Sequence, residues 1–180
     1  MNASNSRDVA ARRWWLWLLL SAGVIAADQL SKAVMLATLH PGETRAIAPF
    51  FNLVLAFNAG AAFSFLGDAS GWQRYLFSAF AVAAAALIVW LLRRGGNRLY
   101  CAALSLILGG AIGNLWDRAT IGRVVDFLQF HDYLPFRHSW LAWMDPFPAF
   151  NVADSAISVG AALLIIDALR LGPSRPARAS

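Results

Sequence analysis

Four long apolar runs, separated by polar or interrupted segments, dominate the sequence. We predict membrane-spanning helices at about residues 14–35, 72–92, 99–116 and 152–169. Each run is close to the ~20 residues that a helix needs to cross ~30 Å of hydrocarbon. The pattern therefore predicts an all-α membrane protein, in which residues 1–180 form a single integral membrane domain.

The two longer connecting segments, at about residues 36–71 and 117–151, differ from ordinary linkers. The first contains "FFNLVLAFN", which is typical of a β-strand, followed by Asn58, Ala59 and Gly60 as a turn or bulge. The second is rich in aromatic residues, and its prolines forbid a continuous helix. We expect both to form a small β and loop platform with an amphipathic segment on the outer membrane surface. The simpler alternative is that they only cover the helix ends.

Basic residues predict the orientation in the membrane. Nine of the fifteen lie in three short segments: Arg7, Arg12 and Arg13; Arg93, Arg94 and Arg98; and Arg170, Arg175 and Arg178. Four spans place all three segments on one side, which the positive-inside rule makes cytoplasmic. We therefore expect a multi-pass protein with both termini in the cytoplasm and both longer segments facing outward.

The N-terminus has a second interpretation. The stretch "ARRWWLWLLLSAGVIAAD" also resembles a signal peptide, with a basic start, an apolar centre and small residues before Asp28. Its removal would leave three spans and put the two remaining basic segments on opposite sides. The charge pattern favours retention of this helix.

Composition agrees with a membrane protein. The chain is 59% hydrophobic and 14% charged, whereas soluble domains carry about a quarter of charged residues. The net charge of +5 is explained by the positions of the basic residues, so no nucleic-acid partner is expected. The single cysteine excludes an intramolecular disulfide, and the three histidines lack zinc-site spacing. We expect no metal and no cofactor.

Four aspartates fall at one depth near the outer membrane boundary. At 1.5 Å of rise per residue, Asp28 lies ~21 Å and Asp117 ~27 Å from the inner ends of their spans, and Asp154 lies ~24 Å from Arg170. Asp126 follows the third span by a short outer segment. Carboxylates at such depths are costly and tend to be functional. Asp8 and Asp167 lie toward the cytoplasmic side and are assigned no role.

Helical spacing groups further polar residues with these acids. Three sets are three or four positions apart and share a helix face: Asp28 with Lys32, Asn114 with Asp117 and Arg118, and Asn151 with Asp154. Gly109 and Gly113 allow close approach of another helix. We expect the polar groups of three spans to converge in one outward-facing pocket.

Each polar group also has a purely structural explanation. Asp154 could cap the fourth span, which for a single aspartate there is the better interpretation. Asp28 with Lys32, and Asp117 with Arg118, could be structural ion pairs, and Asp126 could be solvated. The shared depth of the four acids argues against treating each in isolation.

Two adjacent carboxylates could share a proton and hydrolyse a peptide bond, as in aspartic proteases. A serine–lysine dyad of Lys32 with Ser64 or Ser155 is conceivable, but a lysine among four acids is better explained as paired and charged. Cys101 lies near the inner end, far from the acids, and is a poor candidate nucleophile.

Five sequence blocks, in order between the four spans, carry a family resemblance: "DQLSK", "FNAGAAFSFL", "GGAIGNLWDR", "GRVVDF" and "FPAFNVADSAISVG". With these blocks the chain closely resembles the prolipoprotein signal peptidases, also called signal peptidase II. The resemblance implies an aspartic endopeptidase of the bacterial cytoplasmic (inner) membrane. It would remove signal peptides from diacylglyceryl-modified prolipoproteins, cutting just before the lipidated cysteine. It also implies membrane lipids as surroundings, inhibition by globomycin-type cyclic peptides, and no requirement for an oligomer.

The resemblance assigns roles by motif. Asp126 and Asp154 correspond to the catalytic pair. Four other matching positions would bind the substrate backbone or orient the pair: Asn58, Asn114, Arg118 and Asn151. Gly60 also matches one of the family's supporting positions. Asp28, Lys32 and Asp117 would give structural support.

Two other classes of function remain open from the residues alone. One is a small transporter or proton relay that uses buried acids, although such sites usually lie near the midplane of repeated halves. The other is a non-catalytic membrane subunit that binds a protein through its aromatic outer surface.

Overall fold

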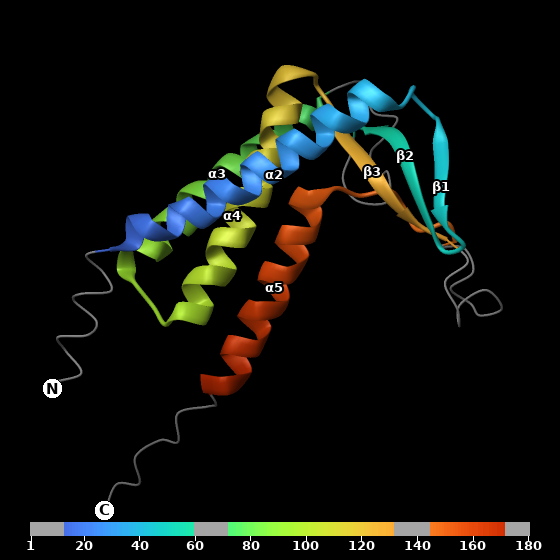
Figure 1. Cartoon of the computed structure of the whole chain (residues 1–180). Helices are drawn as coiled ribbons and strands as arrows, with labels where there is room; N and C mark the ends of the chain where they lie inside the picture. The colour runs from blue at the N-terminus through green and yellow to red at the C-terminus, as the bar shows by residue number, and fades with distance from the viewer. Residues whose placement is uncertain (1–12, 60–71, 132–144, 172–180) are drawn as a thin grey trace, which may run out of the picture.

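The computed structural model describes residues 13–59, 72–131 and 145–171. In order, the elements are a short 3-10 turn η1 (Trp14–Leu16), helix α2 (Trp17–Thr38), strands β1 (Thr44–Ala48) and β2 (Phe51–Asn58), helices α3 (Gln73–Arg94) and α4 (Arg98–Thr120), strand β3 (Val124–Phe130) and helix α5 (Val152–Leu171). The long helices form a bundle, and the strands lie together at one of its ends (Figure 1). We call this the sheet end. The predicted fold class is confirmed.

Four helices in the described residues are long and apolar enough to cross a membrane. They are not equally buried: half of the apolar window of α4 is buried, compared with 11–17% for the other three. Helix α4 packs against α2, α3 and α5, so it forms the centre of the bundle. The other helices keep most of their apolar surface exposed, as contact with lipid tails requires.

Small residues bring α2 and α4 together. A Cβ atom added at Gly109 would lie 2.7 Å from the Val24 side chain, and one added at Gly113 would lie 2.7 Å from a carboxylate oxygen of Asp28. The predicted close approach at this glycine pair is therefore confirmed, and it places the end of α4 directly beside Asp28.

The third span is longer than its hydropathy predicts. We expected it to end near residue 116, but α4 continues to Thr120 and carries Asp117 and Arg118 in its final turns. Their polar side chains have partners inside the protein, so the helix continues past the end of the apolar run. The first span likewise extends to Thr38 rather than to residue 35.

The sheet is antiparallel with strand order β1-β2-β3. The strand predicted from "FFNLVLAFN" is confirmed as β2. Its neighbour β3 was not specifically predicted from the sequence. A register shift between Leu53 and Ala56 precedes the pairing of Ala56 with Asp126 and of Asn58 with Val124. This pairing fixes Asp126 beside the end of β2, close to the start of α5.

Candidate active site

A lysine between two aspartates forms the base of the polar cluster. Lys32 Nζ lies 2.7 Å from Asp28 Oδ2 and 2.8 Å from Asp117 Oδ2, and all three side chains are buried. The predicted pairing of Asp28 with Lys32 is confirmed. The alternative pairing of Asp117 with Arg118 is not what the structure has, because the ion-pair partner of Asp117 is Lys32 on another helix.

The lysine also orients an amide that reaches Asp154. Lys32 Nζ donates to Asn114 Oδ1 at 3.1 Å, and Asn114 Nδ2 donates to Asp154 Oδ1 at 2.7 Å. Because an ammonium group can only donate, the oxygen of Asn114 must face Lys32 and its nitrogen must face Asp154. The lysine therefore fixes the direction of a hydrogen bond to a carboxylate on another helix.

Asn151 joins the two acids that the sequence analysis paired. Its Nδ2 donates to Asp126 Oδ1 at 2.7 Å, to Asn114 Oδ1 at 3.1 Å and to the carbonyl of Val125 at 3.2 Å. Its side-chain oxygen accepts from the backbone N–H of Asp154 at 2.9 Å. Asn151 is fully buried, so these contacts hold its side chain in one position.

Asp154 also caps its helix, as the structural interpretation predicted. Its Oδ2 accepts from the backbone N–H of Asn151 at 3.2 Å, while Asn151 Oδ1 accepts from the N–H of Asp154. This is the reciprocal geometry of a capping box at the start of α5. Capping and a place in the polar cluster are therefore compatible, since the second oxygen of Asp154 points to Asn114.

Asp126 is buried on β3 and accepts hydrogen bonds from two asparagines. Asn58 Nδ2 donates to its Oδ2 at 3.2 Å, and Asn151 donates to its Oδ1. Burial, and then the negative charge of Asp154, raise the pKa of Asp126 to about 7, against the opposing effects of the two asparagines and Lys32. Asp126 is therefore partly protonated near neutral pH.

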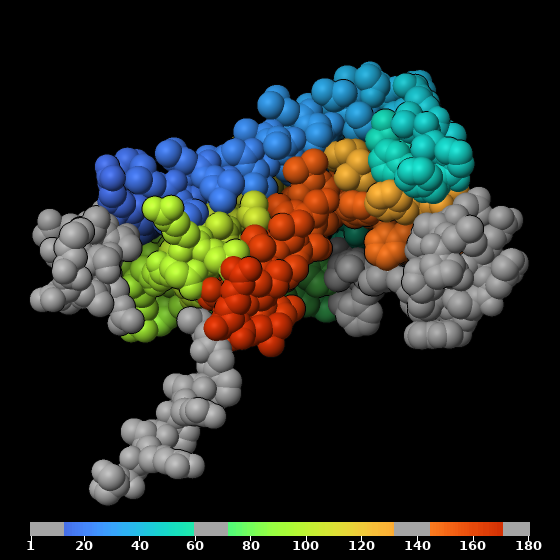
Figure 2. Space-filling model, turned by 60° about the horizontal axis from the view of Figure 1, so that its bottom comes forward, coloured from blue at the N-terminus to red at the C-terminus, as the bar shows by residue number. Residues whose placement is uncertain are grey.

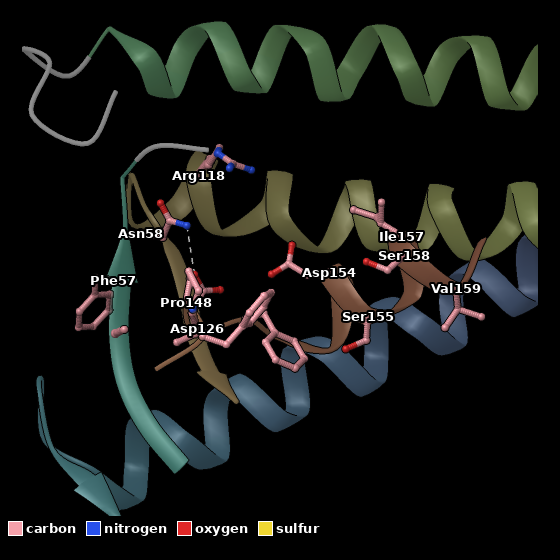
Figure 3. A pocket seen from close by; sticks show the side chains of 14 residues that line it. Phe57, Asn58, Arg118, Asp126, Pro148, Asp154, Ser155, Ile157, Ser158 and Val159 are labelled. Atoms are coloured by element: carbon pink, nitrogen blue, oxygen red, sulfur yellow. Dashed lines mark hydrogen bonds between the residues drawn. The ribbon is translucent and has the colours of Figure 1, made fainter. Parts of the chain in front are cut away.

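Both acids line one cavity of about 780 Å³. Asn58 and Asp126 lie on the sheet side, Arg118 lies on α4, and Asp154 points toward the same space from α5 (Figure 3). The remaining wall is mainly apolar and comes from the segment before α5 and from one face of that helix: Phe147, Pro148, Ala149, Phe150, Ile157 and Val159. Helix α5 is exposed along much of its length beside this region (Figure 2). The cavity thus combines a polar end with an apolar wall.

The predicted convergence of three spans is confirmed for the residues that the structure describes. Direct contacts join seven of the supporting residues to one another or to the two acids: Asp28, Lys32, Asn58, Asn114, Asp117, Arg118 and Asn151. Asn58 and Arg118 line the cavity, and Gly60 lies outside the described residues.

The serine–lysine alternative is not supported at Ser155. Its hydroxyl donates to the carbonyl of Asn151 at 2.9 Å, and Lys32 is held by two carboxylates and Asn114. Lys32 is thus positioned as a charged structural group. Ser64, the other candidate nucleophile, lies outside the described residues.

Gln29 is a site residue that the sequence analysis missed. Its amide donates to Asp28 Oδ2 at 3.1 Å, to Asp117 Oδ1 at 3.0 Å and to the carbonyl of Gly113 at 3.2 Å. A polar amide within an apolar run was a usable signal, since such a group needs partners in the membrane.

Within residues 13–59, 72–131 and 145–171, no group of three or more His, Cys, Asp or Glu side chains is arranged to hold a metal ion. The acids of the cluster are instead engaged by lysine, asparagine, glutamine and backbone donors.

Comparison with known proteins agrees with this geometry. The sequence model of the family described as signal peptidase (SPase) II matches residues 20–170. A lipoprotein signal peptidase of Cupriavidus taiwanensis is 53% identical over 92% of this chain and 89% of its own length, and one of Ralstonia nicotianae is 57% identical over 86% and 84%. A solved bacterial membrane enzyme has a TM-score of 0.74 and 27% identity, covering 92% of this chain and 94% of its own. The family-model match and the identity to these relatives show that the chain belongs to the signal peptidase II family.

Proposed function

We propose that this protein is a membrane aspartic endopeptidase that removes signal peptides from prolipoproteins, with Asp126 and Asp154 as its catalytic pair. One observation carries the proposal: two carboxylates from different elements share Asn151 as a hydrogen-bonding neighbour and line the same cavity. The family membership supplies the class of reaction, and its relatives carry the name lipoprotein signal peptidase.

The pair works by sharing one proton. The ionised carboxylate removes a proton from water while the water oxygen attacks the scissile carbonyl carbon. The protonated carboxyl donates to the carbonyl oxygen, and a proton then passes to the nitrogen as the C–N bond breaks. The raised pKa of Asp126 favours it as the proton-holding member. Asp154, held by Asn114 and the start of α5, then acts as the base.

The polar cluster beside the catalytic pair limits the movement of the two carboxylate side chains. Asn114 is oriented by Lys32, and Asn151 contacts both acids, so neither carboxylate can turn without breaking hydrogen bonds. Such preorganisation keeps reacting groups in place before the substrate arrives. Arg118 and Asn58, at the cavity wall, are suited to contact the substrate backbone.

The cavity wall fits a lipid-modified substrate. Its apolar side runs along α5, a helix with most of its surface exposed, so acyl chains can remain in the membrane while the peptide enters. We infer that the substrate cysteine carries a diacylglyceryl group and that the cut bond lies just before it. Globomycin-type cyclic peptides would occupy the same cavity.

The location follows from charge and depth. We infer that the protein lies in the bacterial inner membrane as a monomer, with both termini cytoplasmic and the sheet end outward. Arg93, Arg94 and Arg98 lie at the end of the bundle opposite the sheet, which the positive-inside rule favours for the cytoplasm. The reacting bond would then meet water on the outer side.

The test is cleavage of a diacylglyceryl-modified precursor by purified protein in detergent, followed by gel shift. Asp126→Asn and Asp154→Asn should each lower the rate by at least about 100-fold, with melting temperatures close to that of the unmodified enzyme. Asp167→Asn is the matched control, because Asp167 is a buried aspartate of α5 far along the helix from the pair, and it should cleave normally. Normal cleavage by either variant of the pair would refute the assignment.

A second arm tests the substrate class. The same precursor with an unmodified cysteine should remain uncut under conditions in which the lipidated form is processed. Equal cleavage of the two forms would contradict the role given to the lipid.

A further inference from the structure

A second cavity lies at the sheet end, apart from the one that holds the acids. It has a volume of about 700 Å³, and its described lining shares no residue with the first cavity. It lies where α3 begins and where the turn after α4 leads into β3, and two of its lining residues are Arg74 and Arg123. The proposed hydrolysis uses neither arginine.

The fold brings these two cations together without an acid between them. Arg74 Nη1 lies 3.4 Å from the position that a Cβ atom would take at Gly122, which directly precedes Arg123. Among the described residues that line the cavity there is no Asp or Glu, and neither arginine forms an ion pair within the described residues. Both arginines line this cavity, so an anion within it would be attracted by two positive charges.

Aromatic rings support both guanidinium groups. The Arg74 guanidinium carbon lies 4.4 Å from the ring centroid of Tyr75, and that of Arg123 lies 5.4 Å from the centroid of Phe57. An arginine held over a ring keeps N–H groups at its edge, in the fork geometry that matches phosphate oxygens.

The start of α3 adds to the positive potential. Its first turn has no acidic residue, and the N-cap residue Trp72 makes no side-chain capping hydrogen bond. The first N–H groups of a helix and its dipole favour an anion at this position. Two arginines and this helix start therefore act on one cavity.

Surrounding side chains place the cavity at the membrane boundary. Trp72 is 48% exposed and Tyr75 64% exposed at the first turn of a membrane-spanning helix, where aromatic residues contact the lipid headgroup layer. A phosphate present at this level belongs to a glycerophospholipid.

We propose that this cavity binds the phosphate group of an anionic glycerophospholipid, with Arg74 and Arg123 as its ligands. The bound lipid would link the start of α3 to the segment that leads into β3 and Asp126. It would therefore stabilise the folded protein without taking part in the reaction.

The experiment measures the melting temperature of the purified full-length protein in neutral detergent. Phosphatidylglycerol should raise it by at least about 3 °C more than phosphatidylcholine does at equal concentration. Arg74→Gln/Arg123→Gln should lose this difference. The control Arg45→Gln/Arg98→Gln, which removes two exposed arginines outside the cavity, should keep it.

Two further measurements sharpen the outcome. Native mass spectrometry should retain phosphatidylglycerol on the unmodified protein and on the control, but much less on Arg123→Gln alone. Inorganic phosphate should give a smaller rise in melting temperature than the lipid. An equal rise in melting temperature with inorganic phosphate would overturn the assignment of a lipid as the ligand. An equal rise with phosphatidylglycerol in the Arg74→Gln/Arg123→Gln variant and in the control would overturn this cavity as the binding site.

Discussion

The two ends of the helix bundle both bury aspartates, but they surround them differently. At the end opposite the sheet, Asp167 accepts one hydrogen bond from Asn97 at 2.6 Å, and Asn97 also caps α4 by accepting from the N–H of Tyr100. A nearby core cluster is purely apolar apart from Cys101 and includes Leu92 and Leu104. This acid connects α5 to the start of α4 and has a structural role.

At the sheet end, acids occur as a connected group. Lys32 forms ion pairs with Asp28 and Asp117. Within the described residues, Asp126 and Asp154 receive only amide and backbone donors, and both line one cavity. Burial alone therefore does not mark a functional carboxylate. Asp126 and Asp154 differ from Asp167 in having a second carboxylate nearby and access to a cavity, and they differ from Asp28 and Asp117 in having no ion pair with Lys32.

The comparison is tested most strongly by Lys32→Met. Removing the lysine leaves two carboxylates buried without their cation, and breaking a buried ion pair in this way costs about 3–5 kcal/mol of unfolding free energy. Chemical denaturation in detergent measures this loss. Asp167→Asn, which removes a charge at the other end, should cost far less, and equal losses would show that the two ends do not differ as described.

Asp117→Asn should have a smaller effect that falls on stability. Asp117 accepts from Lys32, from Gln29 and from the backbone N–H of Val125 at 3.1 Å, so losing its charge weakens these bonds by about 2 kcal/mol. Cleavage per folded molecule should change little. Lost activity with an unchanged melting temperature would contradict the structural role.

The pH dependence of cleavage separates the paired acids from the structural ones. As pH rises through about 7, Asp126 loses the proton that the raised pKa retains, so the cleavage rate should fall by up to about tenfold for each further pH unit. Steady-state rates between pH 5 and pH 9 measure this. An increase in rate over the range 7–9 is incompatible with Asp126 as the proton-holding acid.

The free energy of unfolding should also depend on pH through the protonation of Asp126. The folded-state pKa of Asp126 lies above its usual value of 3.8, so its contribution to stability is complete below pH 3.8 and is lost as pH rises through about 7. The Asp126→Asn protein should therefore lose less stability than the unmodified protein between pH 5 and pH 8. The same change in melting temperature between pH 5 and pH 8 in both proteins would contradict the raised pKa of Asp126.

The smallest effect is expected at the opposite end. Asn97→Ala removes the cap of α4 and the partner of Asp167, which should cost about 1 kcal/mol in unfolding free energy. Cleavage should stay at the level of the unmodified enzyme. A large loss of activity would mean that the two ends are coupled, which the comparison does not predict.

Much of the architecture could be predicted because the hydrophobic pattern is local. Apolar runs of span length predicted four membrane helices, and the stretch "FFNLVLAFN", rich in strand-forming residues, predicted β2. Helix rise predicted one depth for Asp28, Asp117 and Asp154, and the short segment after the third span predicted the same depth for Asp126. The order of the motifs then indicated the family, since each motif is a short continuous stretch.

Other features depend on contacts between distant residues. The end of α4 at Thr120, the place of β3 beside β2 and the partner of Asp117 follow from packing that hydropathy does not record. Gln29 was missed for the same reason, because its three acceptors lie on two helices.

The sequence by itself determined which segments are long and apolar enough to cross a membrane and how far along its helix each of Asp28, Asp117 and Asp154 lies, since both follow from rise per residue and side-chain polarity. Only the tertiary structure decided which acids Lys32 compensates and which two remain beside the cavity. The physical reason is rotation: depth is set along a helix axis, but pairing depends on how each helix is turned and how closely glycines let it approach. That choice gives Asn151 its position between Asp126 and Asp154.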